Sequence, residues 1–205
     1  MEKIKFTKGE LKKQRDSLIQ YNRYLPTLQL KKQQLQMEIL KQSRVLDLKE
    51  RELVIFQNTL MVWAKIFNDA SVSLNDYIKI DKVLTGIKNI AGVDLPVFTR
   101  VDFILSEYDL FAEPLWVDFG IEALEKLISA REELKVVKKS IDILRQELRV
   151  TTQRVNLFEK VKIPDSENAI RLIKIYIGDQ MANAVGRSKA AKKKIENYME
   201  TEAFV

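Results

Sequence analysis

The sequence predicts a mainly α-helical protein, in which the N- and C-terminal helices pair as a long antiparallel two-helix coiled coil around a small central insert with a β-hairpin. Apolar residues recur at alternating spacings of three and four in both flanks, which is the coiled-coil pattern. Half of the 6 Gly and 4 Pro residues fall in one central window of the sequence: Gly86, Gly92, Pro96, Pro114 and Gly120. With 46% hydrophobic and 31% charged residues, the 205-residue chain has apolar surface to bury and few helix breakers.

The first flank, residues 1–75, is expected to form the N-terminal helix. Thr7 is expected to cap its start, with Glu10 completing a capping box. Pro26 lies inside the pattern and should bend the helix without ending it. The predicted coiled-coil core residues of this flank are Leu18, Leu25, Leu35, Ile39, Leu53 and Phe56.

Two lysines, Lys32 and Lys49, also occupy the apolar seam of the first flank. A lysine there would be costly to bury without a partner. Either its ammonium group extends to solvent, or it fixes the register by meeting an acidic residue on the facing helix.

The second flank, residues 118–205, repeats the seam, with Leu134, Ile141, Leu148 and Val155 as predicted core residues. Pro164 interrupts the pattern, and the apolar residues then resume one residue out of phase. We therefore expect a kink near Pro164 and a local unwinding of the supercoil. Helices of this length predict a rod, and the short connection between the flanks predicts antiparallel pairing.

The central insert, residues 76–117, alternates apolar and polar residues and predicts a β-hairpin over about 78–103, followed by a connector. Gly92 is expected to supply the positive φ of its turn, and Pro96 indicates an edge strand. An isolated hairpin is marginal in water, so its apolar residues must pack on the coiled coil or on a partner. These residues are Val83, Ile87, Val93, Phe98, Phe103, Phe111 and Trp116.

The composition excludes several kinds of chemistry. The chain has no Cys and no His, which excludes disulfides, zinc fingers, thiol nucleophiles and imidazole bases. Phosphate-binding, hydrolase and calcium-loop motifs are absent from the sequence, so we assign no catalytic, cofactor-binding or metal-binding residue. Acidic groups such as Glu132 and Glu133 are most simply solvated helix faces. No apolar run approaches the ~20 residues of a membrane span, so a cytoplasmic protein is expected.

A basic run near the C-terminus is the strongest charge feature of a chain with net charge +6. Its cations are Arg187, Lys189, Lys192, Lys193 and Lys194. They could form a solvated helix face or contact nucleic acid, but aromatic residues do not interleave with them. The apolar seam continues through this region, so the cations decorate the end of a coiled coil.

Four blocks of the sequence resemble the D subunit of V-type and A-type rotary ATPases, which is the central rotor shaft. Residues 154–159 read Arg-Val-Asn-Leu-Phe-Glu and are followed by Ile-Pro at 163–164 and Glu-Asn at 167–168, as in the family. The Thr-Lys-Gly-Glu-Leu opening at 7–11, the Asn-Ile-Ala-Gly-Val-Asp-Leu-Pro block at 89–96 and the lysine-rich ending at 189–196 are also similar to it.

This resemblance implies a non-catalytic subunit, peripheral on the cytoplasmic face of the membrane, in a complex that moves protons or sodium ions. The paired helices would enter a ring formed by the A and B subunits, which are the catalytic and regulatory nucleotide-binding subunits, with the basic run as the contact. The hairpin end would hold the F subunit, a small part of the rotor, and dock on the subunit that caps the membrane ring. Its expected contacts are Val83, Ile87, Gly92, Val93, Pro96 and Phe98.

Two alternatives to a rotor shaft remain at the level of sequence. A free-standing coiled-coil scaffold or adaptor explains the heptads equally well, but not the four ordered blocks. A basic nucleic-acid-binding rod explains the net charge, but no groove-reading motif is present in the sequence.

Overall fold

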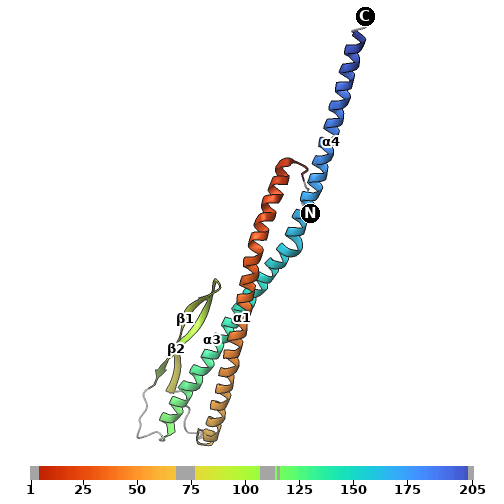
Figure 1. Cartoon of the computed structure of the whole chain (residues 1–205). Helices are drawn as coiled ribbons and strands as arrows, with labels where there is room; N and C mark the ends of the chain where they lie inside the picture. Colours follow the sequence, from red (N-terminus) through yellow and green to blue (C-terminus); the bar gives the residue numbers. More distant parts are fainter. Residues whose placement is uncertain (1–4, 68–76, 107–113, 115, 203–205) are drawn as a thin grey trace. The chain divides into compact units, whose positions relative to one another are not determined.

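The computed structural model describes residues 5–67, 77–106, 114 and 116–202. Three parts of the sequence predictions lie outside these residues: the last part of the N-terminal helix at 68–75, the connector at 107–113 and Phe111 within it. Figure 1 shows the elements in chain order. They are helix α1 (Lys8–Phe67), strand β1 (Ile78–Ile90), strand β2 (Val93–Leu105), helix α3 (Trp116–Leu157), the π-helical turn η1 (Phe158–Lys162) and helix α4 (Ile163–Glu202).

The chain forms two compact units. The first contains residues 1–30 and 152–205, and the second contains residues 31–151. The second unit holds the hairpin and the parts of α1 and α3 that pack with it. The first unit holds the start of α1, the end of α3, η1 and α4.

In the second unit, α1 and α3 run antiparallel. Three ion pairs join them: Lys31 with Glu147, Lys49 with Glu133 and Glu50 with Lys138. The earlier residue of α1 pairs with the later part of α3, and the two later residues of α1 pair with its earlier part, which is the antiparallel order. Leu35 of α1 and Leu144 of α3 belong to one buried cluster in the same register. The predicted antiparallel two-helix coiled coil is confirmed.

The predicted core positions differ in their burial. Leu35, Leu134, Ile141 and Val155 are buried. Leu18, Leu25, Ile39, Leu53, Phe56 and Leu148 are half-buried. The reason is geometric, because two helices alone leave the flanks of their seam open to water, and a third element is needed to close it.

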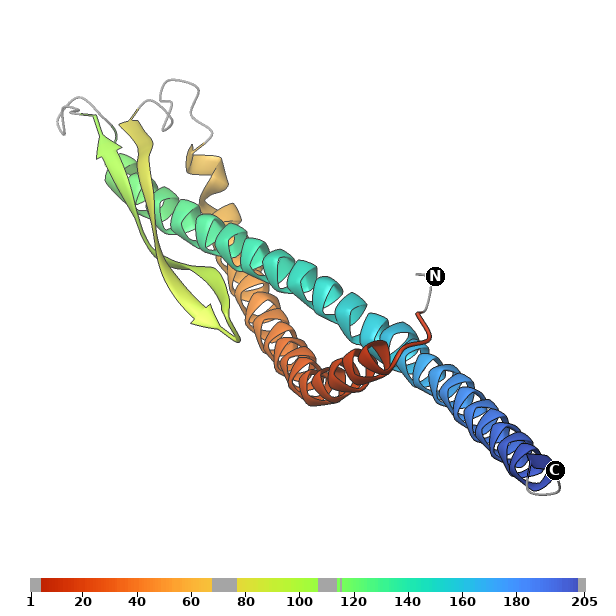
Figure 2. The same ribbon diagram turned by 90° about the horizontal axis from the view of Figure 1, so that it is seen from above.

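The hairpin supplies that third element in the second unit. Strands β1 and β2 pair antiparallel from Ile78 opposite Leu105 to Ile90 opposite Val93. At the base, Ile78 packs with Val117 and Ile121 of α3. At the tip, Leu95 joins the cluster of Leu35 and Leu144. Figures 1 and 2 show the hairpin lying along α3.

The lengths of the strands and of the helix segment agree. From Val117 to Leu144, α3 rises about 40 Å at 1.5 Å per residue. Each 13-residue strand also spans about 40 Å at 3.3 Å per residue. The register shifts between Ile80 and Lys82 and between Leu84 and Thr85. Such bulges increase the twist of a strand pair and let it follow a helix.

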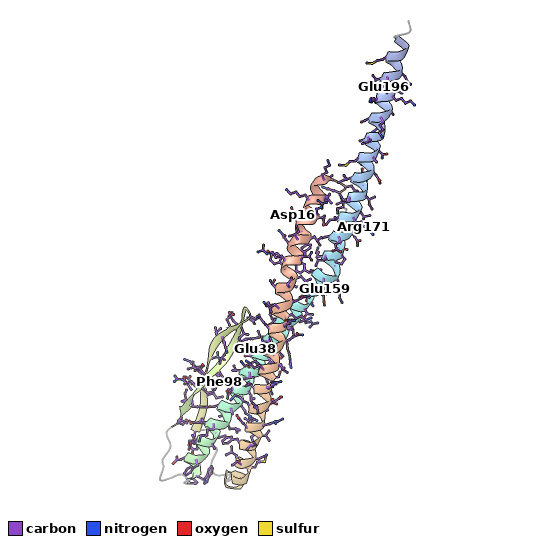
Figure 3. The ribbon with its side chains drawn as sticks, viewed as in Figure 1. Asp16, Glu38, Phe98, Glu159, Arg171 and Glu196 are labelled. Atoms are coloured by element: carbon purple, nitrogen blue, oxygen red, sulfur yellow. The ribbon has the colours of Figure 1, made fainter. Side chains whose placement is uncertain are left out.

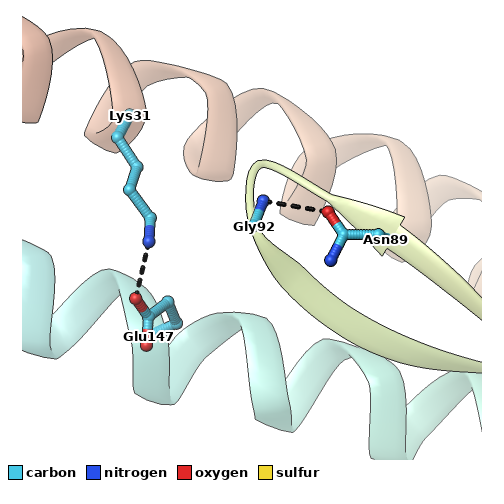
Figure 4. Close-up of polar contacts among 4 residues, drawn as sticks. All are labelled: Lys31, Asn89, Gly92 and Glu147. Atoms are coloured by element: carbon cyan, nitrogen blue, oxygen red, sulfur yellow. Dashed lines mark hydrogen bonds and ion pairs between the residues drawn. The ribbon is translucent and has the colours of Figure 1, made fainter.

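The turn at the hairpin tip contains a second left-handed residue that the sequence did not indicate. Gly92 has φ 75°, as predicted, but Ala91 also has a positive φ of 53°. Two positive φ values in a two-residue loop define the type I′ geometry that matches strand twist. The Asn89 side chain supports the turn: its Oδ1 accepts a hydrogen bond from the Gly92 N–H at 3.2 Å, and its amide donates to Asp94 at 2.6 Å. Figure 4 shows the Asn89–Gly92 bond.

In the first unit, the start of α1 packs antiparallel against η1 and α4. The ring of Tyr21 lies 5.3 Å from that of Phe158, and the ring of Phe6 lies 5.1 Å from that of Tyr176. The buried side chains of α4, Ser166, Ala169, Ile170 and Ile173, lie between these two contacts in the sequence.

The start of α1 is capped as predicted, but by only half of a capping box. The Glu10 N–H donates to Thr7 Oγ1 at 3.2 Å. The second bond of the predicted capping box, in which the Thr7 N–H would donate to the Glu10 carboxylate, is wrong. That N–H donates to the Lys5 carbonyl, and the carboxylate accepts from Gln14. Helix α1 also continues through Pro26, as expected.

The π-helical turn η1 explains the change of phase near Pro164. Before the turn the seam runs through Val155 and Phe158, and after the turn it resumes at the buried Ser166. The step from Phe158 to Ser166 is eight residues, one more than the seven of a heptad repeat. In η1 the Ile163 N–H donates to the Phe158 carbonyl, five residues back. A π-turn accommodates one additional residue in a helix. Both Val155 and Ser166 therefore stay buried, and a kink at Pro164 stays a prediction.

The cluster at the hairpin tip should dominate the stability of the second unit. We expect Leu144→Ala to lower the free energy of unfolding of the isolated chain by about 2–5 kcal/mol, because Leu144 is fully buried and its truncation leaves a cavity. Leu40→Ala is the matched control on α1, where the side chain is 56% exposed. Its effect should stay within about 0.5 kcal/mol. Chemical denaturation measures both, and equal losses would contradict the assignment.

Candidate partner-binding surfaces

Three ion pairs fix the register of α1 against α3. The ammonium groups of Lys31, Lys49 and Lys138 each lie 2.8 Å from a carboxylate oxygen on the other helix. Figure 4 shows Lys31 with Glu147. The side chains of this pair are about 30% exposed, so water weakens the attraction. The pairs therefore select the register more than they contribute stability.

These pairs decide the open question about the seam lysines. Lys49 does meet an acidic residue, Glu133, on the facing helix. For Lys32 the pairing alternative is wrong within the described chain, because its neighbour Lys31 makes the pair with Glu147. The expectation that Glu133 lies on a solvated helix face is therefore wrong, because its carboxylate pairs with Lys49 of the other helix. A single-residue offset along a helix turns a side chain by about 100°, which decides which lysine reaches the partner.

The hairpin residues predicted to contact stalk subunits do not share one face. Val93 packs against the cluster of Leu35, Leu95 and Leu144, so its side chain is used within the chain. Pro96, Phe98 and Val83 are half-buried, and Gly92 lies in the turn. Figure 3 labels Phe98 on the hairpin. Ile87 is 80% exposed and is the most available of the six for a partner.

The C-terminal part of α4 has no neighbour among the described residues of its own unit. Every residue from 178 to 197 is exposed, and Figure 1 shows α4 continuing beyond the start of α1. Apolar side chains share this segment with the predicted cations. Met181, Val185 and Ile195 are each more than half exposed. Exposed apolar side chains gathered on one helix are suited to bury themselves against another molecule.

The five predicted cations all lie on this exposed segment. Lys192 makes an ion pair with Glu196 at 3.5 Å, one turn later on the same helix; Glu196 is labelled in Figure 3. The other four, Arg187, Lys189, Lys193 and Lys194, have no ion-pair partner among the described residues. Their charges are available to an acidic or carbonyl-rich surface.

Metal ligation and membrane spanning find no support among the described residues. Among them, no group of three acidic residues is arranged to hold a metal ion. A hollow of about 240 Å³ lies between the hairpin and the helices of the second unit, lined by residues including Val45, Lys49 and Glu133. No helix in the described part of the chain is long and apolar enough to cross a membrane.

Comparison with known proteins decides the family. A sequence model described as the D subunit of ATP synthase matches residues 10–193. The chain belongs to this family. It is 45% identical over 195 residues to the V-type ATP synthase D subunit of Borreliella burgdorferi, covering 95% of this chain and 96% of the relative. It is 32% identical to the D subunit of Chlamydia pneumoniae, covering 94% and 93%, and 31% identical to that of Chlamydia felis, covering 96% of both.

Ser140 makes a contact in this D-family chain that was not predicted from the sequence. It is 4% exposed on α3, and its Oγ lies 2.7 Å from the Pro96 carbonyl of β2 and 3.0 Å from the Val136 carbonyl of its own helix. Its hydroxyl hydrogen can serve either acceptor. The only available signal was a small polar residue beside the apolar Val137 and Ile141, which does not by itself identify a strand as the partner.

Removing this hydroxyl should loosen the hairpin while leaving the helices paired. We expect Ser140→Ala to lower the free energy of unfolding of the full chain by about 0.5–1.5 kcal/mol, the usual contribution of one hydrogen bond. Amide exchange in β2 should accelerate more than in α3. Ser188→Ala, at an exposed position, is the control and should change neither. Equal acceleration across α3 and β2 would show that Ser140 does not act through the hairpin.

Proposed function

We propose that this chain is the central rotor shaft of a V-type rotary ATPase. In this role it transmits torque between ATP hydrolysis or synthesis in the catalytic ring and ion translocation in the membrane ring. The observation that carries the proposal is the exposed end of α4, residues 178–197, in a chain whose relatives are named subunits of V-type ATP synthases. A helix with exposed apolar and cationic side chains is suited to enter a surrounding set of subunits.

The proposal assigns no reaction to this protein. Its role would be mechanical. A single shaft inside a ring is asymmetric, so it makes different contacts with each of the chemically similar subunits around it. The nucleotide affinity of each then depends on its differential contacts with the shaft. Exposed, screened cations such as Arg187 and Lys193 make weak contacts without deep energy wells, which suits a rotating surface. We place the protein at the cytoplasmic face of the membrane as a peripheral part of the complex.

The partners proposed for the two ends differ. The nucleotide-binding A and B subunits would surround the end of α4. The small F subunit of the rotor and the subunit that caps the membrane ring would bind near the hairpin, with Ile87 as an available contact. The names of the relatives favour this assignment over a free-standing adaptor or a nucleic-acid-binding rod.

A tagged chain expressed in its native cell tests the proposal. After mild solubilisation of the membrane, we expect it to co-purify with nucleotide-binding subunits and with ATPase activity that the isolated chain lacks. Recovery of the chain alone, or with nucleic acid that is released as salt is raised, would contradict the shaft and favour one of the alternatives.

Neutralising the basic run tests the proposed ring contact. We expect the variant with Arg187, Lys189, Lys192, Lys193 and Lys194 all changed to Gln to lower the ATP turnover of the assembled complex about fivefold or more. Each screened contact contributes a few tenths of a kcal/mol, and five together alter the coupling measurably. The control neutralises Lys12, Lys13 and Arg15, exposed cations at the start of α1. Unchanged turnover in the five-residue variant would remove the basic run from the contact.

A further inference from the structure

A hollow lies between the hairpin and the paired helices of the second unit. Its volume is about 240 Å³, and it is partly open to solvent. An apolar cavity of about 150 Å³ is enough to bind benzene, and sites for drug-sized ligands begin near about 300 Å³. The hollow therefore has room for a ligand slightly larger than benzene, and such a ligand can enter without unfolding the chain.

Small residues leave this space open between the two ends at which the hairpin is anchored. On α3 the anchoring clusters hold Ile121 and Leu144, and Val137 lines the hollow between them. On the hairpin, Gly86 pairs with Val97, which also lines the hollow. A Cβ atom added at Gly86 would meet nothing closer than 3.8 Å, so this part of the strand pair leaves space beside it.

Most of the wall of the hollow is apolar. It includes Val45 of α1, Val97 and Phe98 of β2 and Val137 of α3, and Figure 3 labels Phe98. An apolar group placed among these side chains would lose its contact with water, which favours binding. It would also touch both helices and the hairpin at the same time.

Most of the polar groups in the wall already have partners inside the chain. The Lys49 ammonium lies 2.8 Å from the Glu133 carboxylate, and both residues line the hollow. The Ser140 hydroxyl lies within hydrogen-bonding distance of two backbone carbonyls. The side-chain amide of Gln42 donates to Glu38 at 2.9 Å. These groups line the hollow without adding a net charge to it.

Lys88 is the exception. It lines the hollow, and it has no ion-pair partner among the described residues. In the strand pairing Lys88 lies opposite Leu95, whose side chain is 2% exposed in the cluster with Leu35 and Leu144. Cross-strand partners share a face of the strand pair, so Lys88 extends from the face that meets the helices. The rim of an apolar hollow therefore carries one uncompensated positive charge.

We propose that this hollow is a binding site for a small apolar monocarboxylate. The carboxylate pairs with Lys88, and the apolar part lies among Val45, Phe98 and Val137. A single negative charge matches the single free cation, whereas a dianion would be repelled by the Glu133 carboxylate in the same wall. The inference does not depend on the proposed function, because every residue of the site belongs to one unit of this chain.

Titration of the full chain with phenylpropanoate, which combines a benzene ring with one carboxylate, tests the site. We expect saturable shifts of the amide resonances of Val97, Phe98 and Val137 in nuclear magnetic resonance spectra. Amide exchange in both strands should slow, because the ligand joins the hairpin to the helices. Phenylpropanol and phenylpropylamine keep the apolar part but lack the negative charge, and each should bind at least about tenfold more weakly.

Two results of the titration overturn the proposal. The first is equal binding of the three probes, because Lys88 would then play no part and would simply extend to solvent. The second is a set of shifts that does not saturate or that is confined to the basic end of α4, because the carboxylate would then be attracted only by exposed cations.

Removing the cation supplies the second measurement. We expect Lys88→Gln to weaken phenylpropanoate binding at least about tenfold and to leave phenylpropanol binding unchanged. Lys79→Gln, at an exposed lysine of the same strand, is the matched control and should bind phenylpropanoate as the unmodified chain does. Undiminished binding by Lys88→Gln, or equal losses in the two variants, overturns the proposal.

Filling the hollow supplies the third measurement. We expect Val97→Phe to abolish binding of phenylpropanoate, because the added ring occupies the space of the ligand. Ile87→Phe is the control on the other strand, where the side chain is 80% exposed, and should leave binding unchanged. Thermal melting shows whether each variant keeps its fold, and the Lys88→Gln comparison decides if Val97→Phe does not. Undiminished binding by a folded Val97→Phe chain overturns the proposal.

Discussion

The contact on which the second unit depends is the meeting of Leu35, Leu95 and Leu144. One side chain comes from each of α1, β2 and α3, and all three are at most 2% exposed. Full burial of a leucine contributes about 1.5–3 kcal/mol, whereas a half-exposed ion pair contributes about 0–1 kcal/mol. The apolar contact therefore holds the two helices and the hairpin together, and the ion pairs choose among the registers that the seam permits.

Much of this fold could be predicted from the sequence because it is periodic. A spacing of three and four residues specifies which face of a helix is apolar over many turns, so the coiled coil could be located. The alternation around Gly92 located the hairpin for a similar reason. The phase change at Pro164 was also visible, although the sequence alone did not indicate that a π-turn absorbs it.

The remaining features depend on contacts between distant residues. Ala91 has a positive φ, which a Cβ atom disfavours by about 1–2 kcal/mol, and propensity alone argues against it there. Its packing against the cluster of Leu35 and Leu144, together with the Asn89 hydrogen bonds, offsets this cost. Lys31 and Lys32 are chemically identical in the sequence, and only the position of Glu147 selects the first. Ser140 likewise depends on where the Pro96 carbonyl lies.

The π-turn at Phe158–Lys162 has a consequence for comparing members of this family. A relative that lacks the additional residue would form an ordinary helix there, and its alignment with this chain needs a one-residue gap at the turn. If the gap is placed downstream of the turn, every residue between the turn and the gap is aligned with a residue one position away in the relative. That residue's side chain points about 100° away around the helix. Binding positions on α4 can be transferred between species only after this offset has been located.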